Sequence, residues 1–264
     1  MPMDESSGRK SRSQLAGGGF RRCRRESEFW GNEVLKAAIF DIDGTLIDSV
    51  DLHAQSWLET FERFGVQARF ADVRRHIGEG ADRLIPAFVP AEMSNGVRKQ
   101  IEEFRSQLFK REYLGKVKPF PKVKELFAHI KAKRCKLVLA SSCSANEIDQ
   151  YKAIAGIADM SDHDVTADDA GTSKPSPDIF LKALDRLAPI EPFQTCVIGD
   201  TKYDGEAARA ANIPFVGLLC GGSSKEELDR AGAVAVYADP ADLLIHLSRW
   251  LDFPAKREFL GAHS

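Results

Sequence analysis

The sequence has few cysteines, no long apolar run and almost no net charge, and each absence excludes a class of protein. An odd number of scattered cysteines without a CxxC pair argues against a disulfide framework or a zinc site and predicts a reducing, cytoplasmic compartment. No apolar run approaches the ~20 residues that a membrane span needs. The formal charge of −2 gives no reason to expect nucleic acid as a partner. The five cysteines are Cys23, Cys135, Cys143, Cys196 and Cys220.

The composition is that of a soluble globular protein. Of 264 residues, 29% are charged and 43% hydrophobic, which suffices for one or two domains with a sizeable core. Residues 1–30 differ, because they combine glycine and serine stretches with a basic cluster at 21–25 and lack apolar periodicity. Such a segment cannot bury enough surface to offset its ordering entropy, so we predict a disordered basic tail at 1–30 and a second tail at 253–264. For the first tail, the alternatives are a transit peptide and a tail that binds nucleic acid or an anionic surface weakly.

Two carboxylates placed two residues apart are the first functional signal. Asp41 and Asp43 follow the apolar run 34–40, which predicts a buried parallel strand. Open α/β sheets bind ligands at the carboxyl ends of their strands, where both acids would lie. Buried carboxylates this close repel each other and need a cation or a shared proton, and Gly44 lets the backbone approach a ligand closely. An ordinary Asp-Gly turn is the alternative.

The rest of the chain alternates between helix and strand patterns, except for one insertion. Apolar spacing predicts helices over 48–64 and 97–108, without a convincing strand between them. Further on, strands alternate with helices, which implies parallel βαβ units. We therefore predict an α/β fold: a doubly wound, Rossmann-like parallel sheet from 31–48 and 119–252, with a helical domain inserted at 49–118.

Four motifs in a fixed order make the chain resemble the haloacid dehalogenase superfamily of phosphotransferases and phosphatases. The resemblance runs from about residue 34 to residue 250, and it implies that 49–118 is a cap that covers the active site and excludes water. The motifs are marked by Asp41 in Asp-x-Asp-Gly-Thr, Ser141 after an apolar strand pattern, Lys174 before Pro-Ser-Pro-Asp, and Asp200 in Gly-Asp-Thr.

The resemblance also implies a role for each of these residues. Asp41 is expected to be the nucleophile and Asp43 the general acid and base. A Mg²⁺ ion is expected on the Asp41 carboxylate, the Asp43 carbonyl and the Asp200 carboxylate, with Asp204 as an outer ligand. The expected phosphate-binding residues are Ser141, Ser142, Lys174, Gly44 and Thr45.

Substrate recognition is expected from the cap. Residues 77–84, Ile-Gly-Glu-Gly-Ala-Asp-Arg-Leu, resemble the cap segment of phosphoglycolate phosphatases. Gly78 and Gly80 could let the backbone close over a small substrate, while Arg83 or Arg74 could meet its carboxylate. His53, on the first cap helix, is a further candidate. A simple turn with a capping Asp is the alternative.

These expectations together predict a Mg²⁺-dependent phosphatase that acts on a small phosphorylated metabolite, with phosphoglycolate as the leading candidate. The expected enzyme is a monomer or homodimer without a membrane partner, and no nucleic-acid partner is expected for its core. A sugar-phosphate mutase resembling β-phosphoglucomutase is the alternative, and a hexose 1,6-bisphosphate requirement would identify it. A catalytically silent binding protein is a third hypothesis, disfavoured by the intact motif residues.

Overall fold

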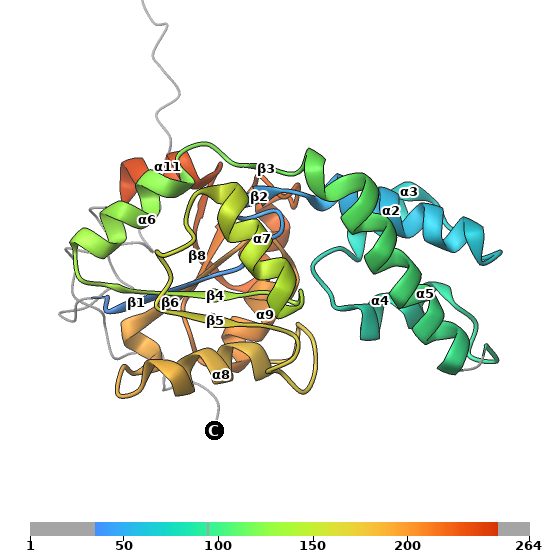
Figure 1. Ribbon diagram of the computed structural model, residues 1–264. Helices are drawn as coiled ribbons and strands as arrows, with labels where there is room; N and C mark the ends of the chain where they lie inside the picture. Colours follow the sequence, from blue (N-terminus) through green and yellow to red (C-terminus); the bar gives the residue numbers. More distant parts are fainter. Residues whose placement is uncertain (1–34, 94, 248–264) are drawn as a thin grey trace, which may run out of the picture.

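The computed structural model describes residues 35–93 and 95–247, and its centre is a six-stranded parallel sheet (Figure 1). The strand order is β5-β4-β1-β6-β7-β8, and each neighbouring pair is parallel, as predicted. Since β1 lies between β4 and β6, the chain crosses in both directions from the first strand, which creates a topological switch point at its carboxyl end. The strands are β1 (Ala37–Phe40), β4 (Lys136–Ala140), β5 (His163–Val165), β6 (Thr195–Gly199), β7 (Phe215–Leu218) and β8 (Ala233–Tyr237).

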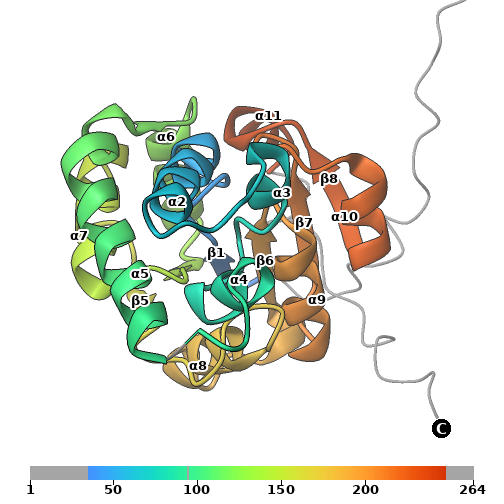
Figure 2. The ribbon, with the colours of Figure 1, turned by 90° about the vertical axis from the view of Figure 1, so that its right-hand side faces the viewer.

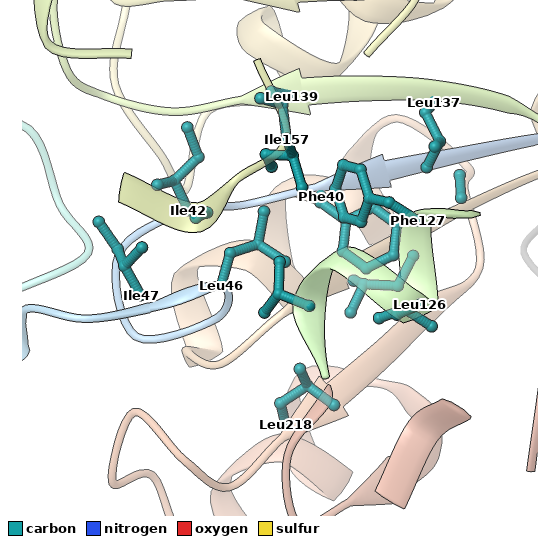
Figure 3. Packing of buried hydrophobic residues seen from close by; sticks show 14 of the residues in the cluster. Phe40, Ile42, Leu46, Ile47, Leu126, Phe127, Leu137, Leu139, Ile157 and Leu218 are labelled. Carbon is teal, nitrogen blue, oxygen red and sulfur yellow. The ribbon is translucent and has the colours of Figure 1, made fainter. Parts of the chain in front are cut away.

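Helices cover both faces of this sheet, because its strands are apolar on both sides. In β1, Ala38 and Phe40 belong to one buried cluster, whereas Ala37 and Ile39 belong to the other. Figure 3 shows the first cluster, in which Phe40 lies beside Phe127 with ring centroids 5.0 Å apart. The covering elements are α6 (Val123–Ala132), α7 (Ala145–Ala155) and α11 (Pro240–His246) on the first cluster, α8 (Asp178–Leu187), α9 (Lys202–Ala210) and α10 (Lys225–Ala231) on the second, and the 3₁₀ turn η3 (Pro192–Gln194).

The inserted helices form a second body with a hydrophobic cluster of its own. Trp57, Phe61 and Ile101 are buried in that cluster. Seen from the side of this cap, its helices lie in front of the carboxyl ends of the strands (Figure 2). The chain enters the cap after β2 (Ile47–Asp48) and returns to the core through β3 (Lys118–Pro119), and these two short strands form an antiparallel pair. The cap elements are α2 (Val50–Arg63), α3 (Phe70–Arg75), α4 (Ala81–Phe88), α5 (Asn95–Leu108), the π-helical segment η1 (Phe109–Tyr113) and the 3₁₀ turn η2 (Leu114–Lys116).

The π-helical segment is a feature that the helical pattern over 97–108 does not predict. It widens the last turn after α5, and such segments frequently occur at functional sites. Here it carries the Phe109 ring onto the imidazole of His53, with a centroid distance of 4.1 Å and an interplanar angle of 10°.

Two further expectations can be compared with the described residues, and a third lies outside them. Among these residues, no helix is long and apolar enough to cross a membrane. Cys135, Cys143, Cys196 and Cys220 are free thiols. The predicted tails at 1–30 and 253–264 lie outside the residues that the structure describes.

Candidate active site

Three neighbouring strands end at the same edge of the sheet, and each is followed by a predicted site residue. Asp41 follows β1, Ser141 follows β4, and Asp200 follows β6. The backbone N–H of Asp41 donates to the carbonyl of Ile198 at 2.9 Å, and that of Ser141 donates to the carbonyl of Val165 at 3.1 Å. The strand hydrogen bonds therefore continue up to these residues and fix where their side chains begin.

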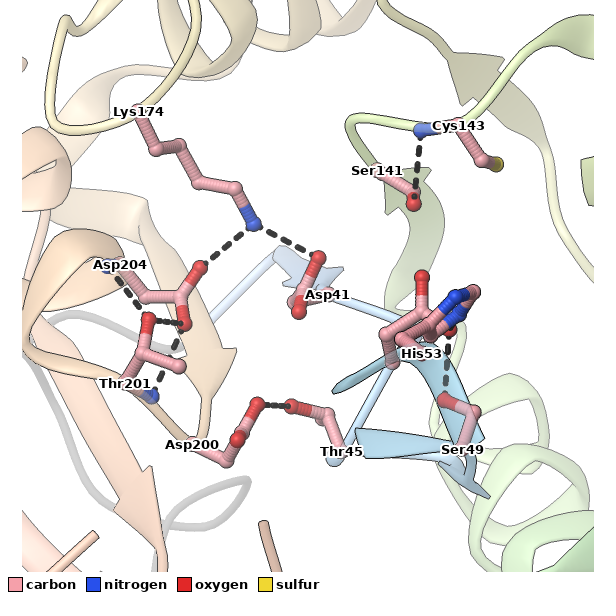
Figure 4. Close-up of polar contacts among 11 residues, drawn as sticks. Asp41, Thr45, Ser49, His53, Ser141, Cys143, Lys174, Asp200, Thr201 and Asp204 are labelled. Carbon is pink, nitrogen blue, oxygen red and sulfur yellow. Dashed lines mark hydrogen bonds and ion pairs between the residues drawn. The ribbon is translucent and has the colours of Figure 1, made fainter. Parts of the chain in front are cut away.

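A buried lysine holds two of the carboxylates. The Lys174 ammonium donates to Asp41 Oδ1 and to Asp204 Oδ1, both at 2.7 Å (Figure 4). Burial lowers the pKa of Lys174, but Asp204 and Asp41 outweigh it, so the net pKa lies above the ordinary value and the group stays charged. Burial also raises the pKa of Asp41 to about 7, against the attraction of Lys174. Lys174 is thus the cation that this crowded site requires.

Asp200 and Asp204 complete an acidic cluster with Asp41. One carboxylate oxygen from each of the three lies within 4.8 Å of the others, and all three residues are buried. Burial, followed by the charges of Asp204 and Asp41, raises the pKa of Asp200 well above its ordinary value. Three carboxylates face one ammonium, and the remaining two negative charges equal the charge of a divalent cation. The donor set therefore fits a hard cation such as Mg²⁺.

The two outer carboxylates are held in different ways. Asp200 Oδ1 accepts a hydrogen bond from Thr45 Oγ1 at 2.9 Å. Asp204 Oδ2 accepts from the backbone N–H of Thr201 at 3.0 Å and from its hydroxyl at 2.6 Å, so Asp204 also closes a capping box at the start of α9. Because both oxygens of Asp204 already have partners, it is the less available of the two for a metal.

Gly44 is required where the backbone passes this cluster. Its φ is +77°, and a Cβ there would lie 2.7 Å from Asp200 Cγ and 2.7 Å from Val50 Cγ2. The sequence predicts a close approach to a ligand at this glycine. In the structure the close approach is to the carboxylate of Asp200.

Asp43 lies on the cap side of Asp41 and is held by cap residues. Its Oδ1 accepts from the Ser49 hydroxyl at 2.6 Å and lies 2.8 Å from His53 Nε2. Burial raises the pKa of Asp43, but the charge of His53, its hydrogen bond and that of Ser49 outweigh burial, so the net pKa is lowered. In this arrangement Asp43 is a carboxylate.

Arg105 of α5 contacts the ring nitrogen of His53 that does not face Asp43. Its guanidinium contacts His53 Nδ1, and its Cζ lies 5.2 Å from the ring centroid of Trp57 and 5.0 Å from that of Phe109. The hydroxyl of Tyr151 lies 3.4 Å from His53 Nε2 on the core side. A chain of contacts therefore connects the proposed acid Asp43 to a cation in the cap.

A cavity of about 270 Å³ lies between cap and core, and most of the predicted site residues line it. Both domains contribute to its wall, so the position of the cap determines its shape. The predicted residues in the wall are Asp41, Asp43, His53, Gly78, Gly80, Ser141, Ser142 and Lys174.

Three predicted site residues have other neighbours in the structure. The hydroxyl of Thr45 is buried, donates to Asp200 Oδ1, and Thr45 lines neither this cavity nor its neighbour. Arg83 is exposed on α4 and lines neither cavity. Successive residues of a helix point in different directions, and here the next residue, Leu84, is the one that is buried in the cavity wall. Arg74 donates to Asp51 Oδ1 at 2.6 Å and to the Gly221 carbonyl at 3.2 Å, so it ties the cap to the core.

The two cap glycines are needed for close packing against the core. Gly78 has a φ of +106°, and a Cβ there would lie 2.7 Å from Thr201 Cγ2. A Cβ on Gly80 would lie 2.7 Å from Ser173 Cβ and overlap the Ser173 hydroxyl. Both glycines thus let the cap loop contact the loops that carry Asp200 and Lys174.

Several cavity residues are absent from the sequence predictions, chiefly Arg105, Glu102, Trp57, Tyr151 and Asp168. One signal for Arg105 was available: it lies four residues after Ile101 and eight after Val97, so helical spacing puts a cation on the apolar face of α5. Glu102 and Asp168 carried no such signal, because isolated acidic residues on a helix or loop usually face solvent.

Comparisons with known proteins agree with this geometry. Residues 38–218 match the family described as haloacid dehalogenase-like hydrolase. The chain is 30% identical over 215 residues to the phosphorylated carbohydrates phosphatase of Thermotoga maritima, covering 80% of this chain and 97% of that protein. It is 31% identical over 196 residues to the phosphoglycolate phosphatase of Aquifex aeolicus, covering 71% and 86%.

A solved structure agrees as well. A hydrolase from Pseudomonas syringae superimposes with a TM-score of 0.73 at 30% identity, over 81% of this chain and 98% of that one. The family match spans well over half of the chain and includes Asp41, Asp43, Ser141, Lys174 and Asp200. The chain therefore belongs to the haloacid dehalogenase-like hydrolases.

Proposed function

We propose that this hydrolase is a Mg²⁺-dependent phosphatase that cleaves a small phosphate monoester through a phosphoryl group carried on Asp41. The observation that carries the proposal is the buried Lys174 ammonium, 2.7 Å from Asp41 Oδ1, in the wall of a cavity that Asp43 and Ser141 also line. A cation beside a carboxylate nucleophile offsets charge on a phosphoryl group during transfer.

The reaction proceeds in two displacements. An Asp41 oxygen attacks phosphorus in line with the ester oxygen, and Asp43 donates a proton to that oxygen as it leaves. Asp43, now ionised, accepts a proton from the water that attacks the phosphorylated Asp41, which restores both carboxyl groups. Ser141 donates a hydrogen bond to the phosphoryl oxygens, and Lys174 balances their charge.

Asp43 must leave its resting contacts to perform the first proton transfer. A carboxylate paired with His53 and Ser49 has no proton to donate, and its net pKa is lowered. Substrate binding therefore has to break this pair and bring Asp43, protonated, to the ester oxygen.

A Mg²⁺ ion would be held by the carboxylates of Asp41 and Asp200 and by the Asp43 carbonyl, with Asp204 in the outer position. The supporting observation is the excess of two negative charges in the buried cluster. When bound, the ion supplies the charge neutralisation that lets an anionic nucleophile approach an anionic phosphoryl group.

The names of two relatives indicate two candidate substrate classes, phosphoglycolate and phosphorylated carbohydrates.

Phosphoryl transfer to Asp41, which both classes would share, is tested by phosphate release from p-nitrophenyl phosphate with Mg²⁺, followed by an acid quench and mass spectrometry of the Asp41 peptide. We expect a phosphorylated Asp41 in the wild type and none in Asp41→Asn. Turnover near the wild-type rate in Asp41→Asn would overturn the proposal.

A sugar-phosphate mutase is compatible with the same carboxylates, since it differs only in which acceptor takes the phosphoryl group. Assays with a hexose phosphate, with and without the matching hexose 1,6-bisphosphate, separate the two activities. A phosphatase releases phosphate without the bisphosphate, whereas a mutase requires it and isomerises the sugar phosphate.

A further inference from the structure

The space beside the catalytic residues continues past the phosphate position. A second cavity of about 240 Å³ adjoins the first, because both are lined by Gly80, Glu102, Ser142 and Lys174. A two-carbon leaving group would leave much of this joined space empty.

The wall of this space is rich in carboxylates. Beyond Asp41 and Asp43, the first cavity is lined by the acidic residues Glu79, Glu102, Glu147 and Asp168. Against them stand two cations. Lys174 is bonded to its two carboxylates, and Arg105 contacts His53 between the rings of Trp57 and Phe109. A leaving group with a carboxylate of its own would enter a predominantly negative environment.

Two of these carboxylates are available to a ligand. Glu147 is occupied by the backbone N–H and hydroxyl of Ser144, and Glu79 lies 3.1 Å from His76 Nδ1. The exposed side chains of Glu102 and Asp168, by contrast, make no hydrogen bond or ion pair with any residue in 35–93 or 95–247. They come from different domains, Glu102 from cap helix α5 and Asp168 from the core loop after β5, and both line the first cavity.

The chemistry of these groups indicates their ligand. An ionised carboxylate only accepts hydrogen bonds, so it binds a hydroxyl that donates and repels a second carboxylate. Ser142 and Ser144 add hydroxyls to the same wall, and Trp57 adds an aromatic surface. Such a lining suits a neutral group with several O–H donors.

We propose that the leaving group is a neutral polyol or sugar whose hydroxyls donate to Glu102 and Asp168, and that these two residues disfavour phosphoglycolate and other carboxylated substrates. The proposal rests on the phosphatase activity proposed above. It makes Glu102 and Asp168 specificity-determining residues and assigns them no part in the phosphoryl transfer.

A matched pair of substrates tests the proposal. Glycerol 3-phosphate and 3-phosphoglycerate share one carbon skeleton and differ in a hydroxymethyl group against a carboxylate. With Mg²⁺ present, we expect kcat/KM to favour glycerol 3-phosphate by about tenfold or more, equivalent to ~1.4 kcal/mol. The kcat/KM for a hexose 6-phosphate should likewise exceed that for phosphoglycolate. Each value is divided by that for p-nitrophenyl phosphate, which carries neither group.

Reversing the charge at Glu102 tests whether this residue causes the substrate preference. Glu102→Lys should reduce the preference for glycerol 3-phosphate over 3-phosphoglycerate by about tenfold. Glu103→Lys is the matched control, because Glu103 is the next residue on α5, is 59% exposed in its side chain, pairs with Lys99 at 3.9 Å and lines neither cavity. It should leave the preference unchanged.

The possible outcomes separate this proposal from the proposed activity. A wild-type preference for 3-phosphoglycerate would overturn the substrate class and point to Arg105 as a carboxylate reader. Equal effects of the Glu102 and Glu103 variants would overturn the role of Glu102. Absence of phosphate release from every substrate, p-nitrophenyl phosphate included, would instead refute the phosphatase activity itself.

Discussion

Replacing Asp41 by Asn should stabilise the metal-free protein while it abolishes turnover. Asp41, Asp200 and Asp204 are three buried carboxylates around one ammonium. In EDTA, the substitution removes one negative charge and leaves Lys174 paired with Asp204. The amide is nearly the same shape as the carboxyl group but is a poor nucleophile, so the fold should persist without activity.

The size of this stabilisation follows from the pKa of Asp41. Burial, the largest cause, raises this pKa from 3.8 to about 7. The folded protein therefore holds the proton more tightly than the unfolded chain, so the free energy of unfolding falls as pH rises from about 4 to about 7. Asparagine stays neutral throughout. Relative to the wild type, the free energy of unfolding of the variant should increase little at pH 4 and by at most roughly 4 kcal/mol above pH 7. For a chain of this size, this increase corresponds to a Tm increase of order 10 °C.

The assay is thermal unfolding followed by circular dichroism in EDTA at pH values from 4 to 8. Asp48→Asn is the matched control, because Asp48 is an exposed carboxylate a few residues away on β2, and we expect no pH-dependent difference from it. If Asp41→Asn unfolds at a lower temperature than the wild type at pH 7 to 8, the attraction of Lys174 outweighs burial and repulsion, and the reasoning is refuted.

Three further predictions concern the metal, the acid and the cap. EDTA should abolish phosphate release, Mg²⁺ should restore it, and Ca²⁺ should restore it poorly because its bonds are longer and its coordination number higher; full activity in metal-free buffer would contradict the assignment. His53→Gln should raise the pKa of Asp43 in the free enzyme, and so move the basic limb of the kcat/KM profile to higher pH, because the neutral form of Asp43 is the general acid; an unmoved limb would show that His53 does not set the pKa of Asp43 in the free enzyme. Gly80→Ala should lower kcat/KM about tenfold or more, since the new Cβ would lie 2.7 Å from Ser173 Cβ, and Ser173→Gly should rescue it; a loss that persists in the double variant would place the cause elsewhere.

The positions of the candidate active-site residues were predictable because these residues occupy strand ends. Asp41, Ser141 and Asp200 each follow an apolar run, and parallel strands of one sheet present their carboxyl ends at the same edge. Local sequence thus determined both the fold class and the position of these side chains. Asn212, just after α9, has a φ of +58°, the left-handed conformation that asparagine tolerates.

The partners of these side chains depended on contacts between distant segments. Thr45 follows Asp41 and Asp43 and was expected at the phosphate, yet its hydroxyl donates to Asp200, 155 residues further along the chain. Arg83 belongs to a segment that resembles a substrate-binding motif, but the rotation of α4 exposes it. Neither outcome follows from spacing along the chain.

The sequence by itself determined that this protein has a parallel α/β core, a helical insertion and a cluster of carboxylates with one lysine at the strand ends. Periodicity encodes these features, because burial of an apolar face depends on residues two to four positions apart. Only the tertiary structure decided that Arg105 contacts His53, that Glu102 and Asp168 line one cavity, and that two cap glycines lie against Thr201 and Ser173. These contacts depend on how a cap helix sits on a separately folded core, which is determined by packing between surfaces and not by any local pattern.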